Sequence, residues 1–270
     1  MSQPAAAPPP TRDPRISYEA GMYALRLGDD ALVLAQRMGE WIASAPQLEE
    51  DVALANIALD QLGQARNLLT YAGSLLPGGD GEPRSEDDLT YLRDERDFVN
   101  VQLVELADGG DFGRCMARLL VFASWQRELY GALVDSADPT LSAVAAKAVK
   151  EVHYHRDHAT QWVLRLGDGT PKSHRRMQGA LDEVWPYVEE LFEPDPVTES
   201  LVAGGVAVDP AALRRPVLDY VSDALQRATL EVPTATVRHG GGRRGIHTEA
   251  MGHLLAELQH VARSHPGAVW

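Results

Sequence analysis

The sequence lacks the features that would place it outside the cell or in a membrane. Cys115 is the only cysteine, so no intrachain disulfide can form, and a reducing, cytoplasmic location is the simplest expectation. No apolar run approaches the ~18 residues that a membrane span needs. The N-terminal MSQPAAAPPPTRDPR has neither a basic n-region nor a long apolar core, so it does not resemble a secretory signal. We expect residues 1–16 to form a disordered, Pro/Ala-rich N-terminus and residues 17–270 to form a single helical domain.

Positive charge is also scarce. The 270 residues include 25 Lys and Arg against 39 Asp and Glu, which gives a formal net charge of −14. Such an excess of negative charge repels nucleic-acid phosphates and anionic lipids, so neither nucleic acid nor a membrane is an expected partner. A basic protein partner remains compatible with this charge.

Helical periodicity dominates the rest of the chain, and we find no sequence repeat and no convincing strand ladder. Asp29 is the expected N-cap of the first helix, because apolar residues then recur at spacings of three and four. Residues 197–210 are ambiguous, and 231–247 are expected to be a long loop. Helices are expected at about 31–45, 46–76, 88–106, 112–136, 140–166, 174–192, 211–230 and 248–263. Four long helices joined by turns, with additional C-terminal helices, predict an all-α helix-bundle fold.

The second expected helix has the most regular apolar pattern in the chain. An alternating spacing of four and three, interrupted once at Arg66, relates Leu48, Val52, Ala55, Leu59, Leu62 and Leu69. This seam is typical of a helix that packs along another helix at a shallow angle.

Histidine is absent before residue 153, which limits the metal chemistry that such a bundle can support. Ferritin-like carboxylate bundles hold two irons with a Glu from each of two helices and a Glu-x-x-His pair from each of the other two. The second helix offers only DQLG, beginning at Asp60, where glycine stands in place of the histidine. In the fourth, Tyr154 comes three residues after Glu151 and His155 comes four residues after it. We therefore cannot assemble a complete di-iron ligand set.

The segment KEVHYHRDH, residues 150–158, permits two further interpretations. Glu151, His155 and His158 fall on one helical face and have the residue types of a single zinc site, although there is no HExxH motif. Alternatively, they are hydrogen-bonded polar residues of the bundle core, with Lys150 placing a cation near buried acids and His153 on the surface. We favour the second interpretation.

Other candidate chemistries have less support. Ser124 and Ser173 lack a G-x-S-x-G context, and Cys115 lies among apolar residues, as a core thiol would. RHGGGRRG, residues 238–245, lacks the Lys-Ser/Thr ending of a P-loop. We interpret it as a flexible linker. The alternative is a basic loop in which Arg243 and Arg244 touch a partner or a phosphate-bearing ligand.

Several blocks together carry a resemblance to a known family over about residues 20–270. They are RLGDDALVLAQRMGEW, PQLEEDVALANIALDQLGQARNLLTYA, LRDERDFVNVQLVE, KAVKEVHYH, LRLGDGT and GIHTEAMGHLLAELQHVARSHPGAVW. The sequence resembles the C subunits of bacterial phenylacetyl-CoA epoxidase complexes. These are multicomponent oxygenases of aerobic phenylacetate degradation. The proline-rich N-terminus departs from the family.

The resemblance implies a ferritin-like fold and a division of labour. In such complexes the paralogous A subunit holds the di-iron centre and the substrate site, and a small B subunit links the heterodimers. A reductase with FAD and an iron–sulfur cluster brings electrons from NADPH. The C subunit pairs with A as a structural, non-catalytic partner. The family pattern Glu-x-x-Tyr-His stands here at Glu151, Tyr154 and His155 as the remnant of a ligand set. No catalytic, cofactor-binding or metal residue is therefore assigned to this chain.

Three functional interpretations follow. In the first, the chain is this metal-free structural subunit, with Leu34, Met38, Leu54 and Ile57 on the contact face. In the second, it is an independent di-iron or zinc oxygenase with a non-standard ligand set, composed of Glu40, Asp60, Glu128, Glu151 and His155. In the third, it is a helical module that binds a CoA ester through RHGGGRRG.

Overall fold

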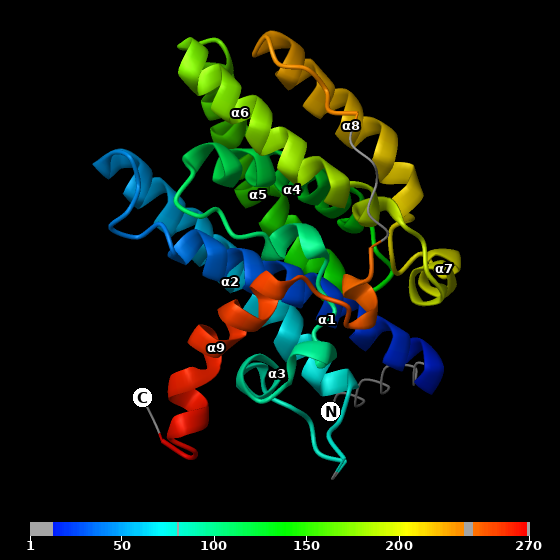
Figure 1. Ribbon diagram of the computed structural model, residues 1–270. Coiled ribbons are helices and arrows are strands. Elements are labelled where there is room, and N and C mark those ends of the chain that lie inside the picture. The colour runs from blue at the N-terminus through cyan, green and yellow to red at the C-terminus, as the bar shows by residue number, and fades with distance from the viewer. Residues whose placement is uncertain (1–12, 80, 235–239, 269–270) are drawn as a thin grey trace, which may run out of the picture.

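The computed structural model describes residues 13–79, 81–234 and 240–268. Within these ranges every regular element is helical, which confirms the predicted all-α class (Figure 1). Residues 1–12 of the expected disordered N-terminus lie outside the described residues. The first helix already begins at Pro14, so the expected boundary at residue 16 falls inside it.

The described elements run in the following order along the chain. The α-helices are α1 (Pro14–Gly39), α2 (Leu48–Leu75), α3 (Glu86–Tyr91), α4 (Phe112–Leu133), α5 (Pro139–Gly167), α6 (Pro171–Val184), α7 (Pro196–Ala203), α8 (Pro210–Arg227) and α9 (Glu249–Ser264). Short 3-10 helices are η1 (Glu95–Asp97), η2 (Gln102–Glu105), η3 (Trp185–Tyr187), η4 (Glu189–Phe192) and η5 (Gly242–Arg244).

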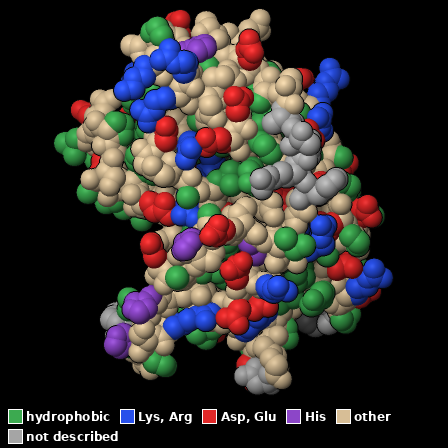
Figure 2. All heavy atoms as spheres, viewed as in Figure 1, with side chains coloured by type: hydrophobic (Ala, Val, Ile, Leu, Met, Phe, Trp, Pro, Cys, Tyr) green, Lys and Arg blue, Asp and Glu red, His purple; other side chains and the backbone are tan. Residues whose placement is uncertain are grey.

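The long helices α1, α2, α4 and α5 form a four-helix bundle of the ferritin-like kind. The closest neighbours are α1 with α2 and α4 with α5, and α2 also packs on α5. Helices α6 and α8 pack on the α4–α5 side, whereas α3 and α9 lie on the other side of the α1–α2 pair (Figure 1). Figure 2 shows basic side chains gathered over the start of α6, while acidic side chains are spread over the visible face.

Helix α1 is longer than the sequence suggested. Its N-cap is Asp13, whose carboxylate accepts from Arg15 N at 2.9 Å. Asp29 lies in the middle of the helix, fully buried, and accepts from Arg93 Nη1 at 2.9 Å and from Val99 N at 3.0 Å. The prediction that Asp29 caps the helix is therefore wrong, because its carboxylate binds partners distant in sequence instead of its own helix end.

The segment expected to be helical at 88–106 is mostly irregular. After α3 and η1, its backbone donates to acids of α1: Val99 N to Asp29, and Val101 N to Asp30 Oδ1 at 2.8 Å. Since these N–H groups are bound by side chains, no i, i−4 ladder forms over them. The expected helix 174–192 ends at Val184, where α6 gives way to η3 with Pro186 inside it.

The contact face that the first interpretation placed on α1 and α2 is buried. Leu34, Met38, Leu54 and Ile57, the expected contact face, are all 0% exposed in the core, so that assignment is wrong. Four members of the regular seam of α2 instead face outward, whereas its last member, Leu69, is buried against Gly28 of α1. The exposed fractions are 76%, 54%, 64% and 40% for Leu48, Val52, Leu59 and Leu62, which together with Gly63 we call the α2 outer face.

Candidate functional site

Polar side chains meet in the middle of the bundle, where a ferritin-like protein would hold its metal. We call this group the polar centre: Gln61 and Gln64 from α2, Gln126 from α4, and Glu151 and His155 from α5. Gln61 Nε2 donates to Gln126 Oε1 at 2.7 Å, and Gln126 Nε2 donates back to Gln61 Oε1 at 3.1 Å. Gln64 Nε2 donates to Glu151 Oε2 at 3.0 Å. The helices are thus joined by side-chain amides.

His155 has a defined tautomer in the polar centre. Its ring is fully buried, and Nδ1 lies 3.3 Å from Gln61 Nε2, which can only donate. The proton is therefore on Nε2, which donates to Asp60 Oδ2 at 3.1 Å. Asp60 lies at the edge of the bundle, with its side chain 38% exposed.

The residues of α2 that face the bundle centre differ by one position from those expected. Gln61 and Gln64 are buried and one turn apart, whereas Gly63 lies on the outer face. The position corresponding to Glu-x-x-His is therefore Gln-x-x-Gln, not the DQLG segment that begins at Asp60. The sequence does show two glutamines three residues apart. Because glutamine is common on helices, this spacing does not distinguish a buried polar centre from a solvent-exposed surface.

The zinc interpretation of KEVHYHRDH is not supported by the geometry. Glu151 binds Gln64 and lies 3.4 Å from Lys147 Nζ, while His155 binds Asp60. His158 Nε2 instead lies 3.1 Å from Glu50 Oε2, at the N-terminal end of α2. Burial lowers the pKa of His158, against the opposing effect of Glu50. The three side chains therefore face different partners. His158 is part of the α2–α5 contact and not of the polar centre.

The residues of the polar centre do not fit a di-iron site. Three neutral amides cannot supply the carboxylate charge that two iron ions require. Of the other proposed ligands, Glu40 pairs with Arg37 at the end of α1, and Glu128 lies 3.3 Å from Arg156 Nη1. Across residues 13–79, 81–234 and 240–268, no three His, Cys, Asp or Glu side chains converge as metal ligands would.

A second buried polar region forms where residues 240–248 lie over α1. We call this segment, together with the acids that bind it, Asp30, Glu105 and Glu190, the clasp. Arg243 Nη2 and Nη1 donate to the two carboxylate oxygens of Asp30 at 2.7 and 3.0 Å. Arg243 Nη1 also lies 2.9 Å from Val99 O. Asp30 is 1% exposed, and burial raises its pKa even though Arg243 opposes the shift.

Glu190 holds the glycine backbone of the clasp. Its Oε1 accepts from Gly241 N at 2.9 Å and from Gly242 N at 2.8 Å, while Oε2 accepts from Gln102 N at 2.7 Å. A side chain on Gly242 would collide with Asn100 O. Gly245 has a φ of +71°, which favours glycine. Gly242 and Gly245 therefore let the clasp pack closely against the backbone of residues 96–102.

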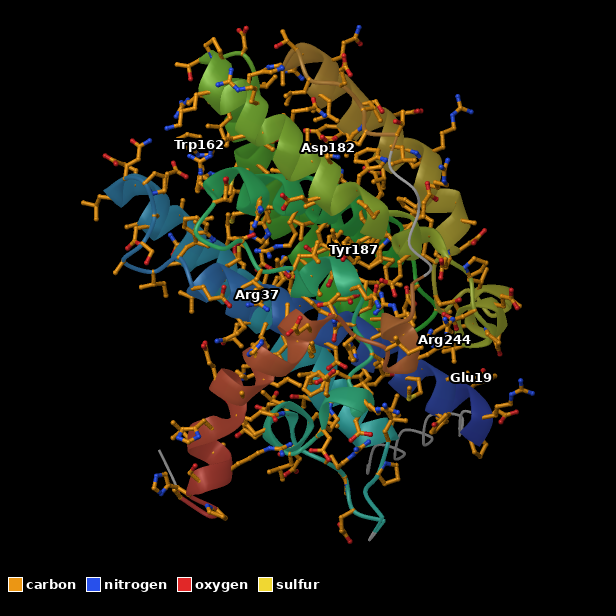
Figure 3. All side chains as sticks on the ribbon, viewed as in Figure 1. Glu19, Arg37, Trp162, Asp182, Tyr187 and Arg244 are labelled. Atoms are coloured by element: carbon orange, nitrogen blue, oxygen red, sulfur yellow. The ribbon has the colours of Figure 1, made fainter. Side chains whose placement is uncertain are left out.

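His247 and Thr248 complete the clasp through Glu105. His247 Nδ1 lies 2.6 Å from Glu105 Oε1, and Nε2 lies 3.0 Å from Phe98 O, so both ring nitrogens face acceptors. Although burial opposes the charge, the hydrogen bond and charge of Glu105 raise the pKa of His247. Thr248 N donates to Glu105 Oε2 at 2.7 Å, which begins α9. Arg37 of α1, labelled in Figure 3, also donates to Ala250 O at 2.9 Å.

The clasp corrects the flexible-linker interpretation of RHGGGRRG and the ligand role expected of Arg243. Residues 238–239 lie outside the described residues. The described remainder is packed against α1, so it is not a flexible linker. Arg243 is bound to Asp30, and Arg244, labelled in Figure 3, donates to Gly240 O at 3.0 Å. Since the Arg243 guanidinium is committed to internal acceptors, it is not available to hold a ligand's phosphates.

The remaining features are consistent with a buried helical core. Cys115 is fully buried, and burial raises the pKa of its thiol well above the usual value, as the prediction of a core thiol requires. Among the described residues, no helix has both the length and the apolar character needed to cross a membrane.

Comparisons with known proteins agree with this fold. The model of the phenylacetic acid catabolic protein family matches residues 7–270. The sequence is 46% identical over 248 residues to the C subunit of the 1,2-phenylacetyl-CoA epoxidase of Escherichia coli (strain K12). That match covers 92% of this chain and 98% of the relative. The chain therefore belongs to the phenylacetic acid catabolic protein family.

Proposed function

We propose that this chain is a structural, non-catalytic subunit of a multicomponent oxygenase that epoxidises the ring of phenylacetyl-CoA in phenylacetate degradation. In this role it pairs with and stabilises a paralogous A subunit that holds the di-iron centre. The relative at 46% identity is named as the C subunit of such an epoxidase. The observation that carries the proposal is the reciprocal Gln61–Gln126 amide pair in the place where ligands would stand.

The polar centre supports a metal-free role on physical grounds. Carboxylates clustered in a bundle core repel one another unless a metal ion or protons neutralise their charge. Neutral amides hydrogen-bond to one another with no such requirement. Gln61 and Gln126 therefore hold α2 and α4 together in a ferritin-like arrangement without iron. The chemistry in the proposed complex belongs to the A subunit, with electrons from NADPH through the FAD and iron–sulfur reductase.

The proposed partners are the A subunit, the small B subunit and the reductase, in the cytoplasm. The two alternative functions lack a supporting observation. An independent di-iron or zinc oxygenase needs ligands that Glu40 and Glu128 do not bring to the polar centre. A CoA-ester module needs free guanidinium groups in the clasp, where Arg243 binds Asp30.

The test is co-expression with the A subunit from the same gene neighbourhood, followed by purification through a tag on this chain. We expect a stable complex in which the iron content equals that of the A subunit alone, about two irons per A chain. This chain purified alone after exposure to Fe(II) and air is the control, and it should bind no stoichiometric iron. Two irons in the isolated chain, or ring epoxidation by this chain with only the reductase, would contradict the proposal.

A further inference from the structure

The α2 outer face is an apolar helix surface with no partner among the described residues. Leu48, Val52 and Leu59 are more than half exposed, and they belong to the most regular seam in the sequence. A seam with alternating spacings of four and three is built to pack along another helix. Because the opposite face of α2 already fills the bundle core and no described segment covers Leu48, Val52 and Leu59, this part of the seam can contact a second polypeptide.

Gly63 is a second, independent indication of a missing helix. It lies in the interior of α2, where glycine weakens a helix relative to alanine, and a Cβ there would meet nothing within 4 Å. The glycines Gly21 and Gly28 in α1 have a clear use, since Cβ atoms there would lie 2.8 Å from atoms of Leu76 and Leu69. Those two glycines let α1 and α2 approach closely. Gly63 offers the same close approach, and no helix in the described part of the chain packs against it.

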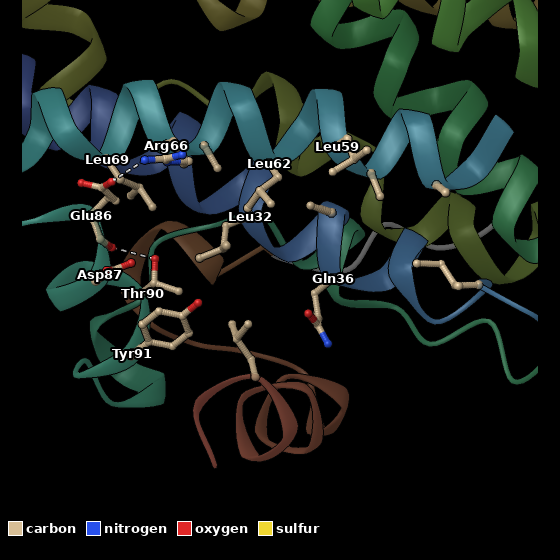
Figure 4. A pocket seen from close by; sticks show the side chains of 16 residues that line it. Leu32, Gln36, Leu59, Leu62, Arg66, Leu69, Glu86, Asp87, Thr90 and Tyr91 are labelled. Atoms are coloured by element: carbon tan, nitrogen blue, oxygen red, sulfur yellow. Dashed lines mark hydrogen bonds and ion pairs between the residues drawn. The ribbon is translucent and has the colours of Figure 1, made fainter. Parts of the chain in front are cut away.

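A groove of about 520 Å³ runs beside this face (Figure 4). Leu59 and Leu62 of α2 and Leu32 of α1 line one side of it, and Tyr91 of α3 and Leu258 of α9 line the other. The space lies between the α1–α2 pair and the α3–α9 pair. Side chains of a helix that packs on Leu59 and Leu62 would therefore have an apolar recess to enter.

The charges around the face identify the kind of occupant. The acids beside the seam and along the groove are Glu49, Asp51, Asp60, Glu86 and Asp87. Arg66 is the basic residue that lines the groove, and its Nη2 lies 3.2 Å from Glu86 Oε1. Two copies of this chain packed face to face would bring these acids together, which is unfavourable. A helix flanked by Lys and Arg would be attracted.

We propose that the α2 outer face is the docking surface for a helix of a different polypeptide. This helix is apolar on one side, carries basic residues along its flanks and crosses α2 at Gly63 at a shallow angle. The inference rests on the proposed function, which supplies the partner, the A subunit. It adds the location and chemistry of the contact.

The experiment measures the dissociation constant between the A subunit and full-length variants of this chain. Leu62→Asp and Gly63→Leu change the α2 outer face. Val232→Asp and Gly179→Leu are the matched controls: Val232 is 43% exposed, and Gly179 lies inside α6 with nothing within 4 Å of a Cβ. We expect at least tenfold weaker binding for both α2 variants, less than threefold change for the controls, and weaker binding of the wild type as salt rises.

Misfolding would not explain weaker binding by Gly63→Leu, because replacing a glycine inside a helix by leucine improves helix propensity. Gly63→Leu should therefore unfold at a temperature equal to or above that of the wild type. Wild-type-like affinity in both α2 variants would overturn the inference and leave the proposed function standing. Failure of the wild type to bind the A subunit would overturn both. A homodimer dissociated by the α2 substitutions would show that the occupant is a second copy instead.

Discussion

The polar centre and the clasp bury polar groups at similar depth but satisfy them by different means. In the polar centre the main contact is a pair of neutral amides, Gln61 and Gln126, 0% and 1% exposed. In the clasp it is an ion pair between Arg243 and Asp30, which is 1% exposed. An amide that loses its partner leaves a neutral polar group in the core, whereas a carboxylate that loses its partner leaves a charge. The clasp is therefore the more sensitive of the two regions.

The largest effect is expected from Arg243→Met, which leaves the Asp30 carboxylate buried without its cation. The free energy of unfolding should fall by about 3–5 kcal/mol, because an uncompensated buried charge must be desolvated or protonated. Urea denaturation followed by circular dichroism measures this change. The double variant with Asp30→Asn should recover part of the loss.

The control for this prediction is an exposed ion pair of the same type. Arg214 donates to both carboxylate oxygens of Glu189, but its side chain is 52% exposed. Arg214→Met should change the free energy of unfolding by about 1 kcal/mol or less. Equal losses in the two variants would show that the clasp is no more sensitive than the surface.

A smaller loss is expected from Gln126→Leu in the polar centre. The substitution keeps a similar volume but leaves the amide of Gln61 without its main partner, so the free energy of unfolding should fall by about 1–3 kcal/mol. Gln178→Leu on α6, where the amide donates to Glu231 O in an exposed contact, should cost about 0.5 kcal/mol or less. A loss from Gln126→Leu as large as that from Arg243→Met would remove the distinction between the two regions.

The smallest effects are expected from two histidines, and they have opposite signs. The pKa of His247 in the clasp is raised, so its stabilising contribution is complete below the unfolded value of about 6.5 and is lost as pH rises through the folded pKa. The pKa of His158, between α2 and α5, is lowered. Its stabilising contribution is therefore complete above the unfolded value of about 6.5 and is lost as pH falls through the folded pKa.

Urea denaturation between about pH 5 and pH 9 separates these two contributions. His247→Gln should destabilise the protein more at the acid end of this range than at the alkaline end. His158→Gln should remove part of the loss of stability at acid pH. The same pH dependence in both variants would contradict the assignment of opposite shifts.

The sequence predicted α2, α4 and α5 well because their apolar periodicity is local. The seam from Leu48 to Leu69 identified α2, and Asp138 followed by Pro139 marked the start of α5. Apolar periodicity identifies the apolar face of a helix, but it does not show whether that face packs in the core of the same chain or against a partner. For this reason Leu34 and Leu54 were assigned to a partner although they are core residues, and the outward direction of Leu59 was missed.

The buried polar regions were predicted poorly because their partners are far apart in sequence. Arg243 and Asp30 are separated by 213 positions, and Arg93 and Asp29 by 64, so local spacing carries no sign of either pair. The polar centre was located on the correct helices through Glu151 and His155. Its amide character was missed, because the acid Asp60 was taken as the candidate ligand, whereas the adjacent Gln61 and, one turn later, Gln64 face the bundle centre.

The 213-residue separation in the clasp also orders events during synthesis. Domains begin to fold from the N-terminal side as the chain leaves the ribosome. Asp30 emerges early with α1, but Arg243 is added only after the four bundle helices have been made. Until Arg243 is added, the Asp30 carboxylate on α1 lacks the guanidinium with which it pairs in the complete protein. A chain whose translation stops before residue 240 would keep the bundle helices but lack this ion pair. Such a chain would be less stable and therefore more readily degraded by cellular proteases.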